Sequence, residues 1–143
     1  MQPINLKRND LIYPELSFNI IGCAFEVFNE LGPGHSEKNY QKAMSVMFTN
    51  QKIPFKEQVY FPLYFKEKLI GKSFLDYLVD EKIIVDLKKN AYFSKTNIEQ
   101  VLGYLKLTNL QLAILINFST EGVLFKRVVN IIPKQSVENI RHS

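Results

Sequence analysis

Two short stretches of the sequence combine an acid and a lysine two positions apart, a pattern that can hold a cation and stabilise a phosphate. They are Asp86-Leu87-Lys88 and Asp80-Glu81-Lys82. With 14 acidic residues in the chain, roughly one or two such triplets are expected by chance, so the pattern alone carries little weight. In the first triplet, strand alternation sends Asp86 and Lys88 to the same face. The second lies in an expected turn, where charges need no special explanation.

Asp76 gives the first triplet more weight, because this acid lies in an apolar stretch where an unpaired carboxylate is costly. If the turn between the two strands contains three residues, Val79 pairs with Ile83, and Asp76 then lies opposite Asp86 on the same face. A two-residue turn would place the acids on opposite faces. Facing carboxylates repel each other without a cation, and hard divalent cations prefer oxygen ligands. The register with a three-residue turn therefore predicts a metal site.

Lys88 could serve such a site in two ways. It could neutralise the two acids, or it could position the attacking water and stabilise negative charge on a phosphate. A purely structural interpretation makes Asp76, Asp86 and Lys88 a buried ion-pair cluster, which is an expensive way to stabilise a small domain.

Several strands and a helix must position these residues. Strands are expected at 55–65, 69–79, 83–88, 112–118 and 123–129, from apolar or alternating runs bounded by polar turns. A helix is expected from Thr96 to about Thr108, with Thr96 and Glu99 as a capping box. Because this helix can act as a crossover, the strands on either side of it should pair in parallel.

Two helices should precede the strands. Apolar residues recur at three- and four-residue spacing from Pro14 to Leu31, and Phe18 and Phe25 widen the predicted buried face. The stretch Gly32-Pro33-Gly34 ends this helix, and a second helix should run from an N-cap at Ser36 to about Gln51. The order ααβββαββ predicts an α/β fold with a mixed β-sheet flanked by helices.

Length and composition fit one domain covering residues 1–143, with a core at about 14–130 and a tail at 131–143. Hydrophobic residues make up 46% of the chain and charged residues 22%, which excludes a disordered chain. The net charge of +4 mildly favours an anionic partner such as nucleic acid.

The single cysteine, Cys23, excludes a disulfide framework and a thiolate metal site, and its apolar surroundings predict a buried thiol. The sequence shows neither a signal-peptide pattern nor a membrane-spanning run. A cytoplasmic protein is therefore expected.

Gly34, Glu37 and Tyr40, in "LGPGHSEKNYQKAM", match the signature of the GxxExxY proteins. The chain resembles this family, which is placed in the PD-(D/E)XK nuclease superfamily, from about residue 16 to 129. The resemblance implies a restriction-endonuclease-like core and a nuclease that depends on Mg²⁺ or Mn²⁺.

The resemblance also implies roles for individual residues. The metal would be held by Glu37, Asp76, Asp86 and the carbonyl of Leu87, and Lys88 would be the catalytic lysine. Gln100 and Tyr104 resemble the Q-x-x-x-Y element that touches substrate or orders the site. The nearby Lys89 and Lys95 would contact the phosphate backbone.

Each of these residues also has a simpler interpretation. An acid such as Glu37 is favoured in the first turn of a helix by the helix dipole alone. Tyr40 fits a core aromatic with a hydrogen-bonded hydroxyl, and Gln100 and Tyr104 fit a polar helix flank. The chain also departs from the family, because Asp86 stands where glutamate is commoner and Phe28 where relatives often show histidine.

The favoured function is metal-dependent hydrolysis of phosphodiester bonds in nucleic acid, DNA before RNA. The alternative is a catalytically inactive nucleic-acid-binding or protein-interaction module on the same fold. Since little of the chain lies outside the expected core, a homodimer or a partner protein could supply specificity. No membrane partner is expected.

Overall fold

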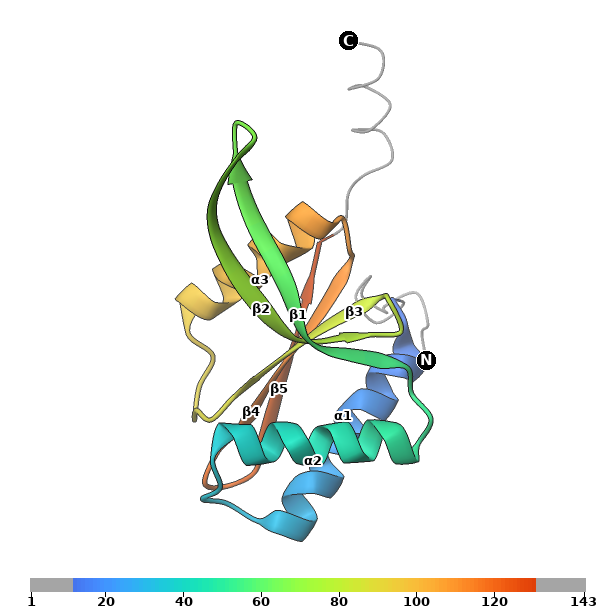
Figure 1. Ribbon diagram of the computed structural model, residues 1–143. Helices are drawn as coiled ribbons and strands as arrows, with labels where there is room; N and C mark the ends of the chain where they lie inside the picture. Colours follow the sequence, from blue (N-terminus) through green and yellow to red (C-terminus); the bar gives the residue numbers. More distant parts are fainter. Residues whose placement is uncertain (1–11, 131–143) are drawn as a thin grey trace, which may run out of the picture.

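The computed structural model describes residues 12–130, and the predicted tail at 131–143 lies outside the described residues. The elements follow the predicted order: α1 (Pro14–Leu31), α2 (Glu37–Asn50), β1 (Phe55–Phe65), β2 (Lys68–Val79), β3 (Ile83–Lys88), α3 (Lys95–Thr108), β4 (Leu112–Phe118) and β5 (Val123–Val129). The strands form one sheet in the order β1-β2-β3-β4-β5 (Figure 1). Only β3 and β4 pair in parallel, across the α3 crossover, and the other described neighbours are antiparallel. The predicted mixed sheet with flanking helices is confirmed.

The helices cover opposite faces of the sheet, so the sheet has an apolar core on each side. One core contains residues of α1 and α2 together with Val85 and Leu87 of β3. The other contains Ile84 of β3 and the buried residues Val101 and Leu105 of α3. Asp86 and Lys88 follow Ile84 at two-residue spacing and therefore share the face that α3 covers.

The turn between α1 and α2 is closed by Tyr40. The Tyr40 hydroxyl donates a 2.7 Å hydrogen bond to the carbonyl of Gly32, and its buried ring stacks on Phe118 of β4 at 4.2 Å. Gly34 has a φ of 93°, in the left-handed region that glycine adopts readily. Ser36 caps α2 by accepting the N–H of Asn39, as the sequence predicts.

Two local predictions were wrong. The N-cap of α3 is Ser94, whose Oγ accepts the N–H of Asn97 at 3.0 Å, so Thr96 lies inside the first turn and forms no capping box. The buried face of α1 is also narrower than predicted, because Phe18 is 77% exposed and Phe25 is 43% exposed. The spacing of apolar residues along a helix shows which side is buried but not how much of the helix surface the sheet covers.

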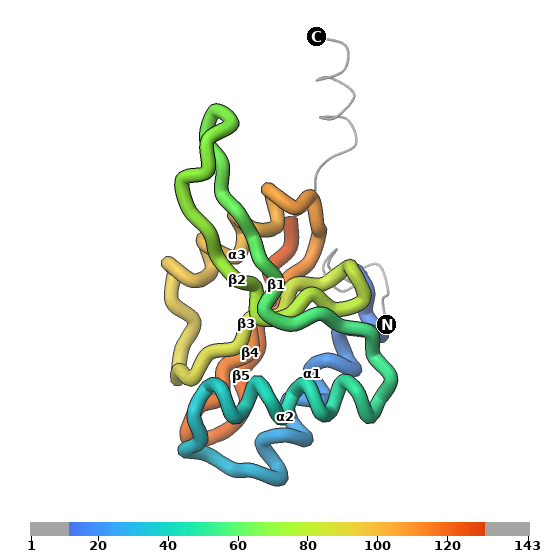
Figure 2. Tube along the Cα trace, viewed as in Figure 1, coloured from blue at the N-terminus to red at the C-terminus, as the bar shows by residue number. Residues whose placement is uncertain are grey.

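The hairpin formed by β1 and β2 extends well beyond the part of the sheet that the helices cover (Figures 1 and 2). We call its outer part, residues 60–74, the β1–β2 arm. Its turn is formed by Lys66 and Glu67, both with positive φ. Large exposed hydrophobic residues line the arm: Tyr60, Leu63, Tyr64, Phe65, Leu69, Ile70 and Phe74.

Cys23 is a free, buried cysteine, as predicted. Burial, followed by the charge of Glu26, raises the pKa of its thiol to about 11. Between residues 12 and 130, no helix is both long enough and apolar enough to cross a membrane. The cytoplasmic location stays a prediction.

Candidate functional site

The β2–β3 hairpin has the register on which the predicted site depends. Val79 pairs with Ile83, and Tyr77 pairs with Val85, so the turn contains three residues, as predicted. The next pair in this register would be Asp76 and Asp86, but the ladder ends before it. Instead, Asp76 Oδ2 accepts the backbone N–H of Leu87 at 2.8 Å. The acids therefore lie where the two strands separate, and a carboxylate takes the place of a backbone acceptor.

The other neighbour of β2 is also irregular at this point. The β1–β2 ladder joins Glu57 to Tyr77 and Val59 to Leu75, but it skips the intervening pair of Gln58 and Asp76. Gln58 has a φ of 51°, which is left-handed and incompatible with a regular strand. Asp76 therefore lies where the ladders of β2 with β1 and with β3 are both interrupted. At such a break, the direction of its side chain need not follow the regular alternation of the sheet.

Asp86 is surrounded by hydrogen-bond donors. Lys88 Nζ lies 3.1 Å from Asp86 Oδ2 and 3.3 Å from Asp86 Oδ1. Asn97, in the first turn of α3, donates from Nδ2 to Asp86 Oδ2 at 3.2 Å. The side chain of Asp86 is only 16% exposed, so these contacts replace water that burial has removed.

The surroundings raise the pKa of Asp76 to about 6 from an ordinary value of 3.8. Burial is the main cause, and the negative charges of Asp86 and Glu37 act in the same direction. The hydrogen bond from Leu87 and the charge of Lys88 oppose the rise. A carboxyl group that ionises near neutrality, beside a second acid, is typical of functional sites.

The pKa of Lys88 is also raised. Burial alone would lower it, but the attraction and hydrogen bond of Asp86 outweigh burial, with smaller contributions from Asp76 and Glu37. Lys88 is therefore a protonated cation at neutral pH, held in place by Asp86.

Glu37 is exposed in the first turn of α2. Its negative charge makes a small contribution to the raised pKa values of Asp76 and Lys88. Among residues 12–130, however, no three His, Cys, Asp or Glu side chains lie close enough together to form a metal-binding group. The ligand set of Glu37, Asp76, Asp86 and the Leu87 carbonyl stays a prediction.

The residues present fit a hard divalent cation in their chemistry. Two carboxylates adjoin, and the pKa of one is raised partly by the charge of the other, so a cation between them would relieve both burial and repulsion. Asn97 Oδ1 is buried beside them without a hydrogen-bond partner. An unpaired buried acceptor in this position suits a water molecule bound to a cation.

Two asparagines near Asp86 and Lys88 were missed from sequence. Asn97 was missed because the predicted capping box started α3 at Thr96 and gave Asn97 no role. Asn117 is 1% exposed on β4, beside Lys88 in the parallel ladder, and donates from Nδ2 to the carbonyl of Tyr92 at 2.7 Å. An amide inside the apolar run 112–118 was a signal that could have revealed it.

The remaining predicted residues lie around this centre without a direct contact to the acids in the described structure. Gln100 is exposed on α3, and Tyr104, one turn later, is half-buried against Phe61 of β1 at 5.1 Å between ring centroids. Lys89 and Lys95 are exposed at the end of β3 and the start of α3. Their substrate-binding roles stay predictions.

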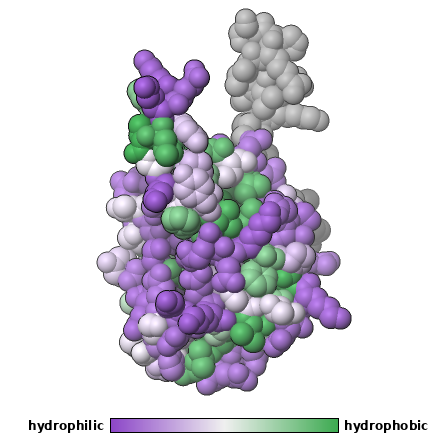
Figure 3. All heavy atoms as spheres, in the orientation of Figure 1, coloured by the Kyte–Doolittle hydropathy of each residue, from purple (hydrophilic) through white to green (hydrophobic). Residues whose placement is uncertain are grey.

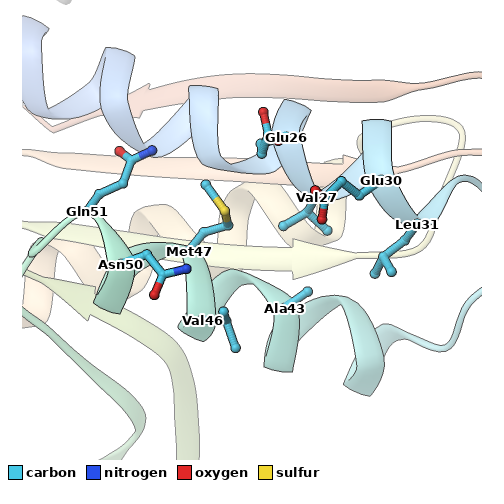
Figure 4. A pocket seen from close by; sticks show the side chains of 9 residues that line it. All are labelled: Glu26, Val27, Glu30, Leu31, Ala43, Val46, Met47, Asn50 and Gln51. Carbon is cyan, nitrogen blue, oxygen red and sulfur yellow. The ribbon is translucent and has the colours of Figure 1, made fainter.

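A cavity and a larger groove lie beside other parts of the fold, and neither is lined by Asp76 or Asp86. A cavity of about 240 Å³ at the ends of β3 and β4 is lined by residues that include Gly34, Lys89 and Ser119. A groove of about 480 Å³ lies between α1 and α2, with Glu26 and Glu30 on its α1 side (Figure 4). This larger groove includes none of the predicted site residues.

Comparisons with known proteins agree with the fold. A solved structure titled "Crystal structure of SSO0001" is similar, with a TM-score of 0.51 and 13% sequence identity. The similarity covers 94% of this chain but only 66% of that one, and at this identity it shows the fold alone. A search of curated proteins gave no match. A family model described as the PD-(D/E)XK nuclease superfamily matches residues 14–128, and the chain therefore belongs to the PD-(D/E)XK nuclease superfamily.

Proposed function

We propose that this protein is a metal-dependent nuclease that hydrolyses phosphodiester bonds in DNA. The observation that carries the proposal is the meeting of Asp76, Asp86 and Lys88 where the β2 and β3 strands separate, with Asp76 bound to the Leu87 N–H and Asp86 paired to Lys88. The superfamily supports nuclease chemistry. The metal and the choice of DNA are parts of the proposal.

In this proposal Asp76, Asp86 and the Leu87 carbonyl hold Mg²⁺ or Mn²⁺, and Glu37 completes the site from α2. The bound ion supplies Lewis-acid stabilisation of phosphate charge and lowers the pKa of water. Asp86 fixes the position of the Lys88 ammonium group, and Asn97 fixes Asp86. Lys88, as a cation, donates hydrogen bonds to a phosphate oxygen or to the attacking water.

The substrate is held by groups around this centre. Lys89 and Lys95 are exposed on either side of the loop that links β3 to α3, where they can contact the phosphate backbone. Gln100 projects from the same helix that covers Asp86, and Tyr104 is buried more deeply against β1.

The test is a cleavage assay on labelled single- and double-stranded DNA and on RNA, in Mg²⁺, Mn²⁺ or EDTA. The chain offers a matched pair of variants, Lys88→Ala and Lys82→Ala, because each removes the lysine of one acid-x-lysine triplet. We expect cleavage that requires the metal, falls at least about 100-fold in Lys88→Ala and is unchanged in Lys82→Ala. Circular dichroism checks that both variants fold.

The alternative is a module with the same fold that binds nucleic acid or protein without turnover. One observation favours it, namely that the described residues hold no cluster of three metal-ligating side chains. Absence of cleavage by the folded protein in either metal, on every substrate, would favour this alternative. A homodimer or partner protein that supplies specificity is a further part of the proposal.

A further inference from the structure

We propose that the β1–β2 arm binds single-stranded DNA, so that the strand that reaches the acid–lysine centre lies along the arm. This inference rests on the proposed function, which makes DNA the substrate. Binding by the arm can nevertheless be measured without cleavage, so the two proposals can fail separately.

Exposed aromatic rings are the first argument. Tyr60, Tyr64 and Phe74 are each at least half exposed. Strand alternation and the pairing of Tyr60 with Phe74 place all three on one face of the arm, opposite to Phe65. Tyr60 and Phe74 pair across the two strands, with ring centroids 5.7 Å apart and a tilt of 58°, so parts of their faces stay open. Exposed ring faces on a sheet are the platforms on which single-stranded nucleic acids stack their bases, independently of sequence.

Charge complementarity is the second argument. Within residues 60–74 the sequence has three lysines, Lys66, Lys68 and Lys72, and a single acid, Glu67. All three lysines are exposed, and Lys66 Nζ lies 5.6 Å from the centroid of the Phe65 ring. Cations interleaved with aromatic rings match a chain that alternates phosphates and bases. By contrast, the groove between α1 and α2 has Glu26 and Glu30 in its lining, which would repel such a chain.

The arm is also continuous with the centre. Phe74 and Asp76 lie two residues apart on β2, and the arm extends from Phe74 to its turn over roughly 20 Å at strand spacing. In the space-filling view, a hydrophobic band lies directly below the hydrophilic tip of the arm (Figure 3). A strand lying on this band would lead toward the break in β2 where Asp76 lies.

The competing occupant is a second copy of this chain. Leu63, Leu69 and Ile70 are exposed on the arm as well, and an exposed apolar patch can mark a protein interface. The excess of lysine over acid argues against two identical arms packed together, because like charges would meet in the interface. Interface cores are also depleted in lysine.

A tryptophan probe tests base stacking directly, because the chain contains no tryptophan. Tyr64→Trp places a single reporter on the face of the arm that carries Tyr60 and Phe74, and Phe18→Trp places a matched one on the exposed side of α1. Each full-length variant is titrated in EDTA with a 20-nucleotide single-stranded DNA, a duplex of the same sequence and an RNA of the same sequence. We expect single-stranded DNA to quench the arm reporter and leave the α1 reporter unchanged.

A second measurement separates stacking from general apolar contact. Tyr60→Leu/Tyr64→Leu keeps apolar side chains for a protein partner but removes two rings from the same face of the arm. We expect this variant to bind single-stranded DNA roughly tenfold more weakly or worse in fluorescence anisotropy, compared with no change for Phe18→Leu. Lys66→Gln/Lys68→Gln/Lys72→Gln should reduce the slope of log affinity against log salt concentration by roughly 0.7 for each phosphate that the lysines no longer neutralise.

The outcomes separate cleanly. Quenching in EDTA together with weaker binding by the leucine variant supports the arm, even if cleavage is absent. Cleavage without quenching, or equal binding by the leucine variant, overturns it. Tighter binding of RNA overturns the assignment to DNA. The proposal is also overturned if gel filtration shows a dimer that persists in the leucine variant and if DNA does not quench the arm reporter. That result would assign the arm to a second copy of the chain.

Discussion

Both acid-x-lysine triplets place an aspartate two positions before a lysine, but their surroundings differ. Asp80 and Lys82 form an ion pair at 3.3 Å with side chains 40% and 48% exposed, while Asp86 and Lys88 pair at 3.1 Å with 16% and 33% exposed. The first pair is on a turn, and its carboxylate and ammonium groups bond only to each other among the described side-chain hydrogen bonds and ion pairs. The second is joined by Asn97 and is coupled to Asp76. The burial and the partners of each pair therefore come from the elements around it and not from the triplet itself.

The largest expected difference between the two triplets is in the affinity for a divalent metal ion. Asp86→Asn removes a proposed ligand, whereas Asp80→Asn makes the same change in the turn. We expect Asp86→Asn to weaken Mn²⁺ binding at least about 100-fold, because even groups outside the ligand shell contribute about 10- to 100-fold, and Asp80→Asn to leave it unchanged. Isothermal titration calorimetry measures both. Equal affinities in the two variants would contradict the proposed metal site.

The second largest expected effect is a pH dependence of the stability of the metal-free protein, caused by the raised pKa of Asp76. The unfolded chain releases this proton near the ordinary value of 3.8, but the folded protein releases it near 6. Asp76 should therefore destabilise the fold progressively as pH rises from about 4 to about 6, with a total of about 2–3 kcal/mol that persists above pH 6. Asp76→Asn keeps an acceptor for the Leu87 N–H but has no carboxyl group to ionise, so it should not lose stability as the pH rises. In EDTA at pH 7 its free energy of unfolding should therefore be larger than that of the wild type.

Urea unfolding of the wild type and Asp76→Asn from pH 4 to pH 8 in EDTA measures this difference. A difference in unfolding free energy that is constant across this range would show that Asp76 does not titrate as described. Asp80→Asn serves as the control, because its carboxylate lies in the exposed turn.

Asn97 should produce a smaller effect. It donates to Asp86 from outside the proposed ligand set, and such outer groups orient a ligand without binding the metal. Asn97→Ala should weaken Mn²⁺ binding by roughly tenfold, while Thr96→Ala, in the same helical turn, should not. An unchanged affinity in Asn97→Ala would mean that Lys88 alone orients Asp86.

The smallest effect belongs to the turn triplet. Because exposed ion pairs contribute little, Lys82→Ala should change the free energy of unfolding by less than about 0.5 kcal/mol. Thermal or urea denaturation checks this value. A larger loss would indicate a structural role for the Asp80–Lys82 pair or for the contact of Lys82 Nζ with the Tyr13 ring, 5.7 Å from the ring centroid.

The sequence predicted the elements and the hairpin register well, because both follow from local patterns. Alternation fixed the faces of β3, and the three-residue turn fixed the pairing of Val79 with Ile83. The breaks in strand pairing at Asp76 could not be predicted, because neither the left-handed φ of Gln58 on β1 nor the end of the β2–β3 ladder before Asp76 follows from a local pattern. The contact of Asn97 with Asp86 was also missed, because it joins α3 to β3 through tertiary packing. The exposure of Phe18 was missed for the same reason, because it depends on which side of α1 packs against the rest of the fold.

The separation of β2 from β3 has a consequence for how the protein folds. Asp76 and Leu87 are only 11 positions apart, so their contact closes a short loop and needs no other part of the chain. Hairpins of this kind form within about microseconds, before pairings between distant segments. The two acids can therefore approach each other early, and the repulsion between them opposes that step, although the ammonium group of Lys88 in the same hairpin partly offsets it. Protonation or a bound cation would ease this step, which links the order of folding to the chemistry of the finished centre.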